Sequence, residues 1–183
     1  MDQISSFFKE YWNMVLSYSS EEKLLTLNWD DFIRLVSVMN IKSCGTNIEK
    51  RILAQNNWIK VRGHDSHGDG MTPDGRIIEI KSSIVSPLKG SSVTFRGIRP
   101  WHKIDEHHFI LTDLSDFRNK PITTTFMLTP QQIIYERDVE KVLTRYNKKK
   151  ADVIDNENIE LGTSFKKDDL KRWENEYRSK INL

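Results

Sequence analysis

The chain contains a single cysteine, Cys44, among its 183 residues. One thiol excludes an intrachain disulfide and a cysteine-based zinc site, and it suits a reducing compartment. Apolar runs of membrane-spanning length are also missing. The acidic Asp2 at the start, and Lys9 and Glu10 within the next apolar cluster, argue against a signal peptide. We therefore expect a soluble cytoplasmic protein that does not enter a membrane.

The sequence has no internal repeat, low-complexity tract or linker that would divide it. A chain of 183 residues with 37% hydrophobic content can bury one proper core, but not two comfortably. We expect one domain over residues 1–183. It would consist of a helical N-terminal segment at 1–45, a central core at 46–147 and a C-terminal loop and helix at 148–183.

Acidic residues are absent from one stretch, between Ile80 and Ile104. The net charge of the whole chain is only +2, so the basic character of this stretch is local. Its five positive charges are Lys81, Lys89, Arg96, Arg99 and Lys103. A local excess of Lys and Arg favours a phosphate-rich partner, although incidental basic loops also occur on soluble proteins.

Apolar residues in the first forty positions recur every three or four residues, which predicts helices. The first set is rich in aromatic residues and belongs either to the core or to a dimer interface: Ile4, Phe7, Phe8, Tyr11, Trp12, Val15 and Leu16. Two more helices are expected, near Ser20–Glu22 and across residues 32–39. Thr46 and Glu49 have the spacing of a capping box, which predicts a helix from Thr46 to about Gln55.

The most informative stretch of the chain runs from His67 to Lys81. At its centre, residues 72–75 read Thr-Pro-Asp-Gly. This order suits a β-turn, because proline fixes φ at the first corner and glycine accepts a positive φ. The stretch therefore predicts a β-hairpin that folds about Asp74.

Such a hairpin pairs residues whose numbers sum to about 148. Asp69 then faces Glu79 at roughly 5 Å between Cβ atoms. Because side chains alternate along a strand, Glu79 and Lys81 share one face, and Ile78 and Ile80 share the other. The hairpin thus brings two carboxylates together beside one lysine.

Two carboxylates this close repel each other unless a cation lies between them. Oxygen ligands favour a hard ion such as Mg²⁺, which takes one or two carboxylates and keeps several waters. A neighbouring lysine can orient or deprotonate one of these waters. From the spacing alone, the alternative is that Glu79 and Lys81 form a surface ion pair and that Asp69 has no role beyond preceding a glycine.

Asp69, nine intervening residues and then Glu79-Ile80-Lys81-Ser82 resemble the signature of the PD-(D/E)XK nucleases. The closest likeness is to type II restriction endonucleases, and the order and spacing of elements from about Thr46 to about Leu128 agree with that family. A Pro-Asp pair also occurs at Pro73–Asp74. Only four residues separate Asp74 from Glu79, and the pair lies in the turn, so we leave it out of the motif.

The resemblance implies an α/β fold with a restriction-endonuclease-like core, in which helices flank a mixed central β-sheet. It implies a Mg²⁺-dependent endonuclease that cuts double-stranded DNA at a short specific sequence, leaves 5′-phosphate and 3′-hydroxyl ends, and acts as a homodimer. Asp69, Glu79 and the carbonyl of Ile80 would hold the ion, and Lys81 would help to activate a water. Family members often carry a glutamate on the helix before the sheet. Glu49 has the position of this glutamate, although its expected role in the capping box with Thr46 also accounts for a glutamate there.

The acid-free stretch is dense in side chains that hydrogen-bond base edges and phosphates. In type II restriction enzymes the segment after the Glu-x-Lys strand often carries recognition residues. We therefore predict that DNA binding involves Lys89, Ser91, Ser92, Thr94, Arg96 and Arg99. From Ser82 to Lys103 we expect loop with one short strand at most, and the alternative is a solvated connection.

Further strands are expected at 58–62, 107–112 and 122–128, the last because it is rich in threonine. A helix should begin at Thr129–Pro130 and end at Lys148–Lys150. Its predicted buried stripe is Tyr135, Val139, Val142, Leu143 and Tyr146. A last helix within 164–181 should dock through Leu170, Trp173, Tyr177 and Ile181.

Two other functions stay open at this point. The same hairpin also serves structure-selective nucleases, such as Holliday-junction resolvases and repair nucleases, which cut branched DNA. The chain could also be a non-catalytic DNA-binding module. The presence of Asp69, Glu79 and Lys81 together speaks against the module.

Overall fold

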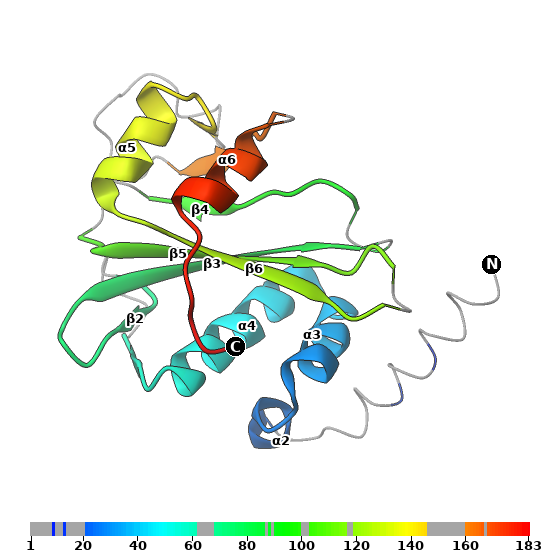
Figure 1. Ribbon diagram of the computed structural model, residues 1–183. Coiled ribbons are helices and arrows are strands. Elements are labelled where there is room, and N and C mark those ends of the chain that lie inside the picture. The colour runs from blue at the N-terminus through cyan, green and yellow to red at the C-terminus, as the bar shows by residue number, and fades with distance from the viewer. Residues whose placement is uncertain are drawn as a thin grey trace.

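The computed structural model describes residues 21–61, 68–86, 88, 90–99, 103–116, 119–145, 160–166 and 168–183, together with Lys9 and Asn13. Its elements, in chain order (Figure 1), are α2 (Glu21–Leu25), α3 (Trp29–Ser37), α4 (Ile41–Gln55), β1 (Ile59–Lys60), β2 (Gly70–Met71), β3 (Ile77–Val85), β4 (Arg96–Ile98), β5 (Glu106–Asp113), β6 (Ile122–Leu128), α5 (Pro130–Asp138), β7 (Leu143–Arg145), β8 (Leu161–Thr163) and α6 (Asp169–Glu176).

A mixed sheet of five strands in the order β1-β2-β3-β5-β6 lies at the centre. β1, β2 and β3 are antiparallel neighbours, and β6 is antiparallel to β5. β5 runs parallel to β3, from the pair Ile78–Glu106 to the pair Val85–Asp113. A parallel pair needs a long crossover, and here the crossover contains β4. The predicted mixed α/β class with a mixed sheet is confirmed.

The central sheet separates two hydrophobic cores. In Figure 1, α3 and α4 lie on one side of the sheet and α5 and α6 on the other. The first core includes Phe32, Leu35, Val36, Ile48, Ile52, Ile78, Ile80 and Ile110. The second core also contains residues of the smaller sheet β4-β8-β7, and it includes Phe95, Ile98, Phe109, Phe126, Ile133, Leu161 and Trp173.

The strand alternation of β3 follows these two cores. Ile78 and Ile80 are buried in the first core, as their spacing predicts. Lys81 is the register partner of Phe109, which belongs to the second core. Neighbours in register share a face of a sheet, so Glu79 and Lys81 lie on the face that β4, α5 and α6 cover.

The predicted capping box at Thr46 and Glu49 is wrong. α4 begins five residues earlier, at Ile41, and the Asn40 side chain accepts a hydrogen bond from the N–H of Ser43 at 2.9 Å. Asparagine is at least as good an N-cap as threonine, so the helix can begin after Asn40 and is longer than predicted. The expected boundary between residues 45 and 46 therefore falls inside α4. A capping box does occur at Thr129 and Gln132, at the start of α5.

The predicted buried stripe of α5 is also wrong. The helix ends at Asp138, and Tyr135 and Val139 are 44% and 60% exposed. Lys141 adopts a positive φ of 59°, which a helix cannot continue. Val142 and Leu143 are buried, but they reach the second core from the start of β7 instead of from a helix.

The other expected strands are present with shifted ends. β1 is shorter than expected, whereas β3 continues to Val85 where loop was expected. β5, β6 and a shortened C-terminal helix match their predictions, and Trp173 and Tyr177 are buried. The apolar side chains between Ile4 and Leu16, and His64, His67, Lys89, Tyr146 and Lys148–Lys150, lie outside the described residues. Among the helices that the structure describes, none is long and apolar enough to cross a membrane.

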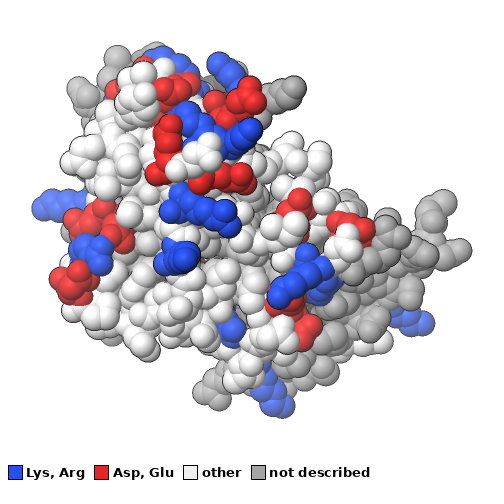
Figure 2. All heavy atoms as spheres, viewed as in Figure 1, with Lys and Arg blue, Asp and Glu red and all other residues white. Residues whose placement is uncertain are grey.

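Charges of both signs are mixed on the face that carries α5 and α6. Figure 2 shows Lys and Arg side chains beside Asp and Glu side chains there. Arg172 pairs with Glu136 and Glu176, and Arg137 pairs with Asp138. These pairs neutralise Arg172 and Arg137 locally.

Candidate active site

The β2–β3 hairpin has the predicted register. Gly70 pairs with Ile78 and Met71 with Ile77, so the paired numbers sum to 148. Continued by one residue, this register would pair Asp69 with Glu79. Residues in such positions have Cβ atoms roughly 5 Å apart. The strand pairs end at Gly70 with Ile78, and the N–H of Asp69 also donates to the carbonyl of Ile78, so the direct opposition of Asp69 and Glu79 stays a prediction.

Asp74 belongs to the turn, as expected. The N–H of Gly75 donates to the carbonyl of Thr72 at 2.9 Å, and Gly75 has a φ of 88°. The Asp74 carboxylate accepts hydrogen bonds from the Thr72 hydroxyl at 2.6 Å and from Nε of Arg76 at 2.9 Å. These local bonds explain the presence of Asp74 without any role in the motif.

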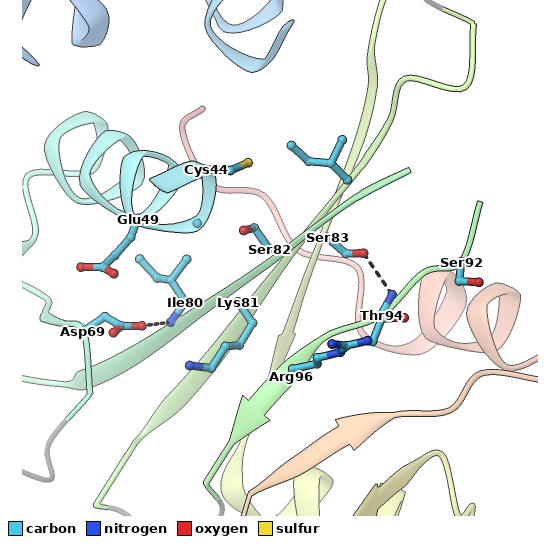
Figure 3. A pocket seen from close by; sticks show the side chains of 12 residues that line it. Cys44, Glu49, Asp69, Ile80, Lys81, Ser82, Ser83, Ser92, Thr94 and Arg96 are labelled. Carbon is cyan, nitrogen blue, oxygen red and sulfur yellow. Dashed lines mark hydrogen bonds between the residues drawn. The ribbon is translucent and has the colours of Figure 1, made fainter. Parts of the chain in front are cut away.

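Asp69 is attached to β3 at two points. Its N–H donates to the carbonyl of Ile78 at 2.8 Å, and its Oδ2 accepts the N–H of Ile80 at 2.7 Å (Figure 3). Gly68 precedes it with a φ of 78°, and a Cβ at this position would lie 2.4 Å from the Ile78 carbonyl oxygen. A larger residue would push the backbone away, so Gly68 permits the close approach that holds Asp69.

Glu79 is a buried carboxylate in an acidic neighbourhood. Its side chain forms an ion pair with the Lys81 ammonium. Burial raises the pKa of Glu79, Lys81 lowers it, and the nearby charge of Asp69 raises it again; the net pKa lies above its ordinary value. The electrostatic contact with Asp69 is the one that the hairpin register predicts.

Glu49 adds a third carboxylate from α4. Its side chain points toward Asp69 in Figure 3. Burial and then the charge of Asp69 raise the pKa of Glu49, although Lys60 donates to it at 3.2 Å and opposes this shift. Glu49 caps no helix, so the expected cap does not explain it; its partner in the structure is Lys60.

Glu49, Asp69 and Lys81 line a cavity of about 460 Å³, whereas Glu79 does not line it. Cys44, Gly45 and Glu49 of α4 form one wall. β3 contributes residues 80–84, because β2 pairs only with Ile77 and Ile78 and, within the described ranges, no named strand covers β3 further along that edge. The opposite wall carries Ser92, Thr94 and Arg96. No family model and no curated protein matches this chain.

The predicted DNA-binding residues separate into two groups. Ser92, Thr94 and Arg96 line the cavity that Asp69 and Lys81 also line. Ser91 is exposed but does not line it, and Lys89 lies outside the described residues. The Arg99 guanidinium is bound by the Glu160 carboxylate, with Nε at 3.1 Å, so the structure gives Arg99 a partner within the chain.

Several residues of the cavity were not foreseen. Cys44 and Gly45 were missed because the start of α4 was misplaced. Ser82 and Ser83 were missed because their segment was expected to be loop; the alternation of β3, extended by two residues beyond Lys81, was the available signal for Ser83. His107 and His108 are both buried, and neither lines the cavity.

The oxygen atoms near β3 bear on whether a divalent cation could bind here. In the part of the chain that the structure describes, no group of three or more His, Cys, Asp and Glu side chains is arranged to hold a metal ion. Mg²⁺ does not need one, because it commonly uses one or two carboxylates with waters and other oxygens. The carbonyl of Ile80 points to the same side of β3 as its N–H, which binds Asp69. Asp69, Glu79 and this carbonyl are oxygen donors of the kind that a hard cation prefers.

Proposed function

We propose that the protein is a Mg²⁺-dependent endonuclease of the PD-(D/E)XK type with a restriction-endonuclease-like core, and that it cleaves double-stranded DNA at a short specific sequence. The observation that carries this proposal is that Asp69 and Lys81 line one cavity with Ser92, Thr94 and Arg96, while Glu79 pairs with Lys81 and has its pKa raised by burial and by the nearby charge of Asp69. Carboxylates, a lysine and phosphate-binding side chains are the groups that phosphodiester hydrolysis requires.

Asp69, Glu79 and the Ile80 carbonyl would hold the ion, which when bound would supply positive charge to the transition state. Lys81 is assigned to the attacking water and to the phosphate. The water loses a proton and its oxygen bonds to phosphorus in line. The bond from phosphorus to the 3′ oxygen breaks, and this oxygen takes up a proton. The products are a 5′-phosphate and a 3′-hydroxyl.

A homodimer on a palindromic site extends this proposal. One chain carries one such set of residues and would cut one strand. Two-fold symmetry of a dimer would match the two-fold symmetry of a palindrome and would place a second set on the other strand.

Supercoiled plasmid incubated with Mg²⁺ tests the function directly. Discrete fragments, lost in EDTA and with Lys81→Ala, are the expected result. Cleavage confined to branched junction substrates would indicate a structure-selective nuclease instead. A gel shift without any cleavage would leave a DNA-binding module and would overturn the proposed chemistry.

A further inference from the structure

The loop of residues 91–95 is fastened on two sides by side-chain hydroxyls. The N–H of Thr94 donates to Oγ of Ser83 at 3.0 Å, a bond drawn in Figure 3. The N–H of the next residue, Phe95, donates to Oγ1 of Thr163 at 2.9 Å. One fastening therefore comes from β3 and the other from β8 of the smaller sheet.

The hydroxyls of Thr163 and Ser83 bind two different parts of the loop. Phe95 is completely buried in the second core, so packing already fixes its position and the hydrogen bond to Thr163 only strengthens this. Thr94 is only half-buried, and its side chain and those of Ser92 and Arg96 line the cavity. The bond from Ser83 thus acts on the part of the loop that faces a substrate.

Ser83 also has a defined relation to the catalytic groups. It lies two residues after Lys81 on the same strand, and side chains two apart on a strand share a face. Its side chain is buried, with the residue 7% exposed, so water competes poorly for the bond to Thr94. A rigid strand therefore joins Lys81 to the point where the loop is attached.

We propose that Ser83 is a positioning residue that fixes Ser92, Thr94 and Arg96 relative to Lys81. This inference rests on the proposed function, because it assigns the loop to substrate recognition. A substrate that fits the loop then has its phosphate held at the correct offset from Lys81, whereas a poorly fitting substrate does not. Loss of the hydroxyl lets the loop adapt to either substrate and uncouples recognition from cleavage.

The test compares Ser83→Ala with a matched variant, Thr125→Val. Thr125 is also 7% exposed and donates a buried hydrogen bond at 2.7 Å to the carbonyl of Ser179, but it does not line the cavity. Ser83→Ala should lower kcat/KM for the preferred site by about tenfold, the factor that one hydrogen bond of ordinary strength provides, through a lower kcat as well as a higher KM, because the phosphate is no longer held at its offset from Lys81. It should also narrow the ratio of kcat/KM between the preferred site and a site with one changed base pair.

Two further variants separate position from stability. Ser83→Thr keeps the hydroxyl and should restore kcat/KM and selectivity. Ser83→Cys is close in volume but has a weak acceptor, so it should behave like Ser83→Ala and replaces that variant if it does not fold. Equal changes of kcat/KM and selectivity in Ser83→Ala and Thr125→Val would overturn the inference.

Hydrogen exchange at the Thr94 amide supplies a measurement without any substrate. It should be about tenfold faster in Ser83→Ala than in the parent and unchanged in Thr125→Val. A protein that cuts no DNA would refute the proposed function, while the exchange rate would still show whether the hydrogen bond from Thr94 to Ser83 is formed. A protein that cuts DNA and shows unchanged Thr94 exchange in Ser83→Ala would refute the role of Ser83 alone.

Discussion

Glu79 and Glu136 are both buried carboxylates, but their surroundings differ. Glu136, on α5, accepts two hydrogen bonds from the Arg172 guanidinium, at 2.7 and 2.6 Å. It accepts two more, from Nε1 of Trp173 at 2.9 Å and from the Tyr177 hydroxyl at 2.7 Å. Glu79 has an ion pair with Lys81 and lies near a second carboxylate, Asp69.

The pKa values of the two groups move in opposite directions. Burial would raise the pKa of Glu136, but the hydrogen bonds from Arg172, Trp173 and Tyr177 outweigh it, and the pKa lies below its ordinary value. The pKa of Glu79 lies above its ordinary value, because burial and Asp69 outweigh Lys81. A carboxylate that the fold fully neutralises joins α5 to α6, whereas one left with excess negative charge can accept a cation from solution.

Asp69→Ala should have the largest effect in this comparison. It removes one of the two proposed carboxylate ligands, so cleavage should fall by several orders of magnitude, while the fold persists with a small loss of stability from the lost bond to the Ile80 N–H. Plasmid cleavage and calorimetry measure the two quantities. Asp74→Asn is the control, because Asp74 bonds only within the turn, and it should cut at nearly the parent rate. An essential Asp74 with a dispensable Asp69 would show that the motif is wrongly assigned.

Lys81→Ala should separate binding from chemistry. Loss of a group that acts on the water should lower cleavage by about 100- to 10,000-fold, with DNA affinity in Ca²⁺ retained. Because the ammonium no longer competes for Glu79, the affinity for Ca²⁺ itself should increase, as isothermal titration calorimetry would measure. Weaker Ca²⁺ binding would mean that Lys81 supports the cation site instead of competing with it.

Glu136→Gln should weaken the fold and leave the chemistry intact. It removes the buried carboxylate of Arg172, which keeps its pair with Glu176, and should cost about 3 kcal/mol, the low end for a broken buried ion pair because Arg172 is partly exposed. Urea unfolding measures this loss. Cleavage well below the unfolding temperature should match the parent, and a selective loss of kcat would connect Glu136 to the active site after all.

Glu79→Gln should give the smallest change in stability, and this change should be a gain, unlike the loss expected for Glu136→Gln. A raised folded pKa means that ionisation of Glu79 opposes folding once the pH rises through the ordinary value of 4.5, so Gln should stabilise the metal-free protein at pH 7. The lowered folded pKa of Glu136 means that its stabilisation is present above 4.5 and is lost as the pH falls through the folded pKa. If Glu79→Gln and Glu136→Gln shifted the unfolding curve in the same direction at pH 7, the two buried carboxylates would not differ as described.

The hairpin could be predicted from the sequence because its determinants are local. The turn residues, the alternation after them and the distance from Asp69 to Glu79 all lie within about a dozen positions, and Gly70 does pair with Ile78. The predicted start of α4 was wrong, and the reason is also local. Asn40 and Thr46 both have capping chemistry, and the sequence does not say which one the first core selects.

The remaining features depend on contacts between distant segments. Arg172 lies 36 residues after Glu136, and a glutamate on a short helix is usually exposed, so nothing local indicates that Glu136 is buried. The partner of Arg99, Glu160, lies 61 residues away, so the sequence around Arg99 does not indicate this ion pair. The same holds for Ser83, whose role depends on a loop that folds back onto β3.

The close approach at Gly68 has a consequence for finding relatives of this chain. A search for the acidic pair and the lysine alone uses three common residue types at loose spacing. The backbone around Asp69 adds a steric condition, since a Cβ at Gly68 would meet the Ile78 carbonyl oxygen and one at Gly70 would meet Leu53 and Ile59. Gly-Asp-Gly, followed by glutamate ten positions after the aspartate and lysine two positions later, is therefore a more discriminating query than the acidic motif by itself.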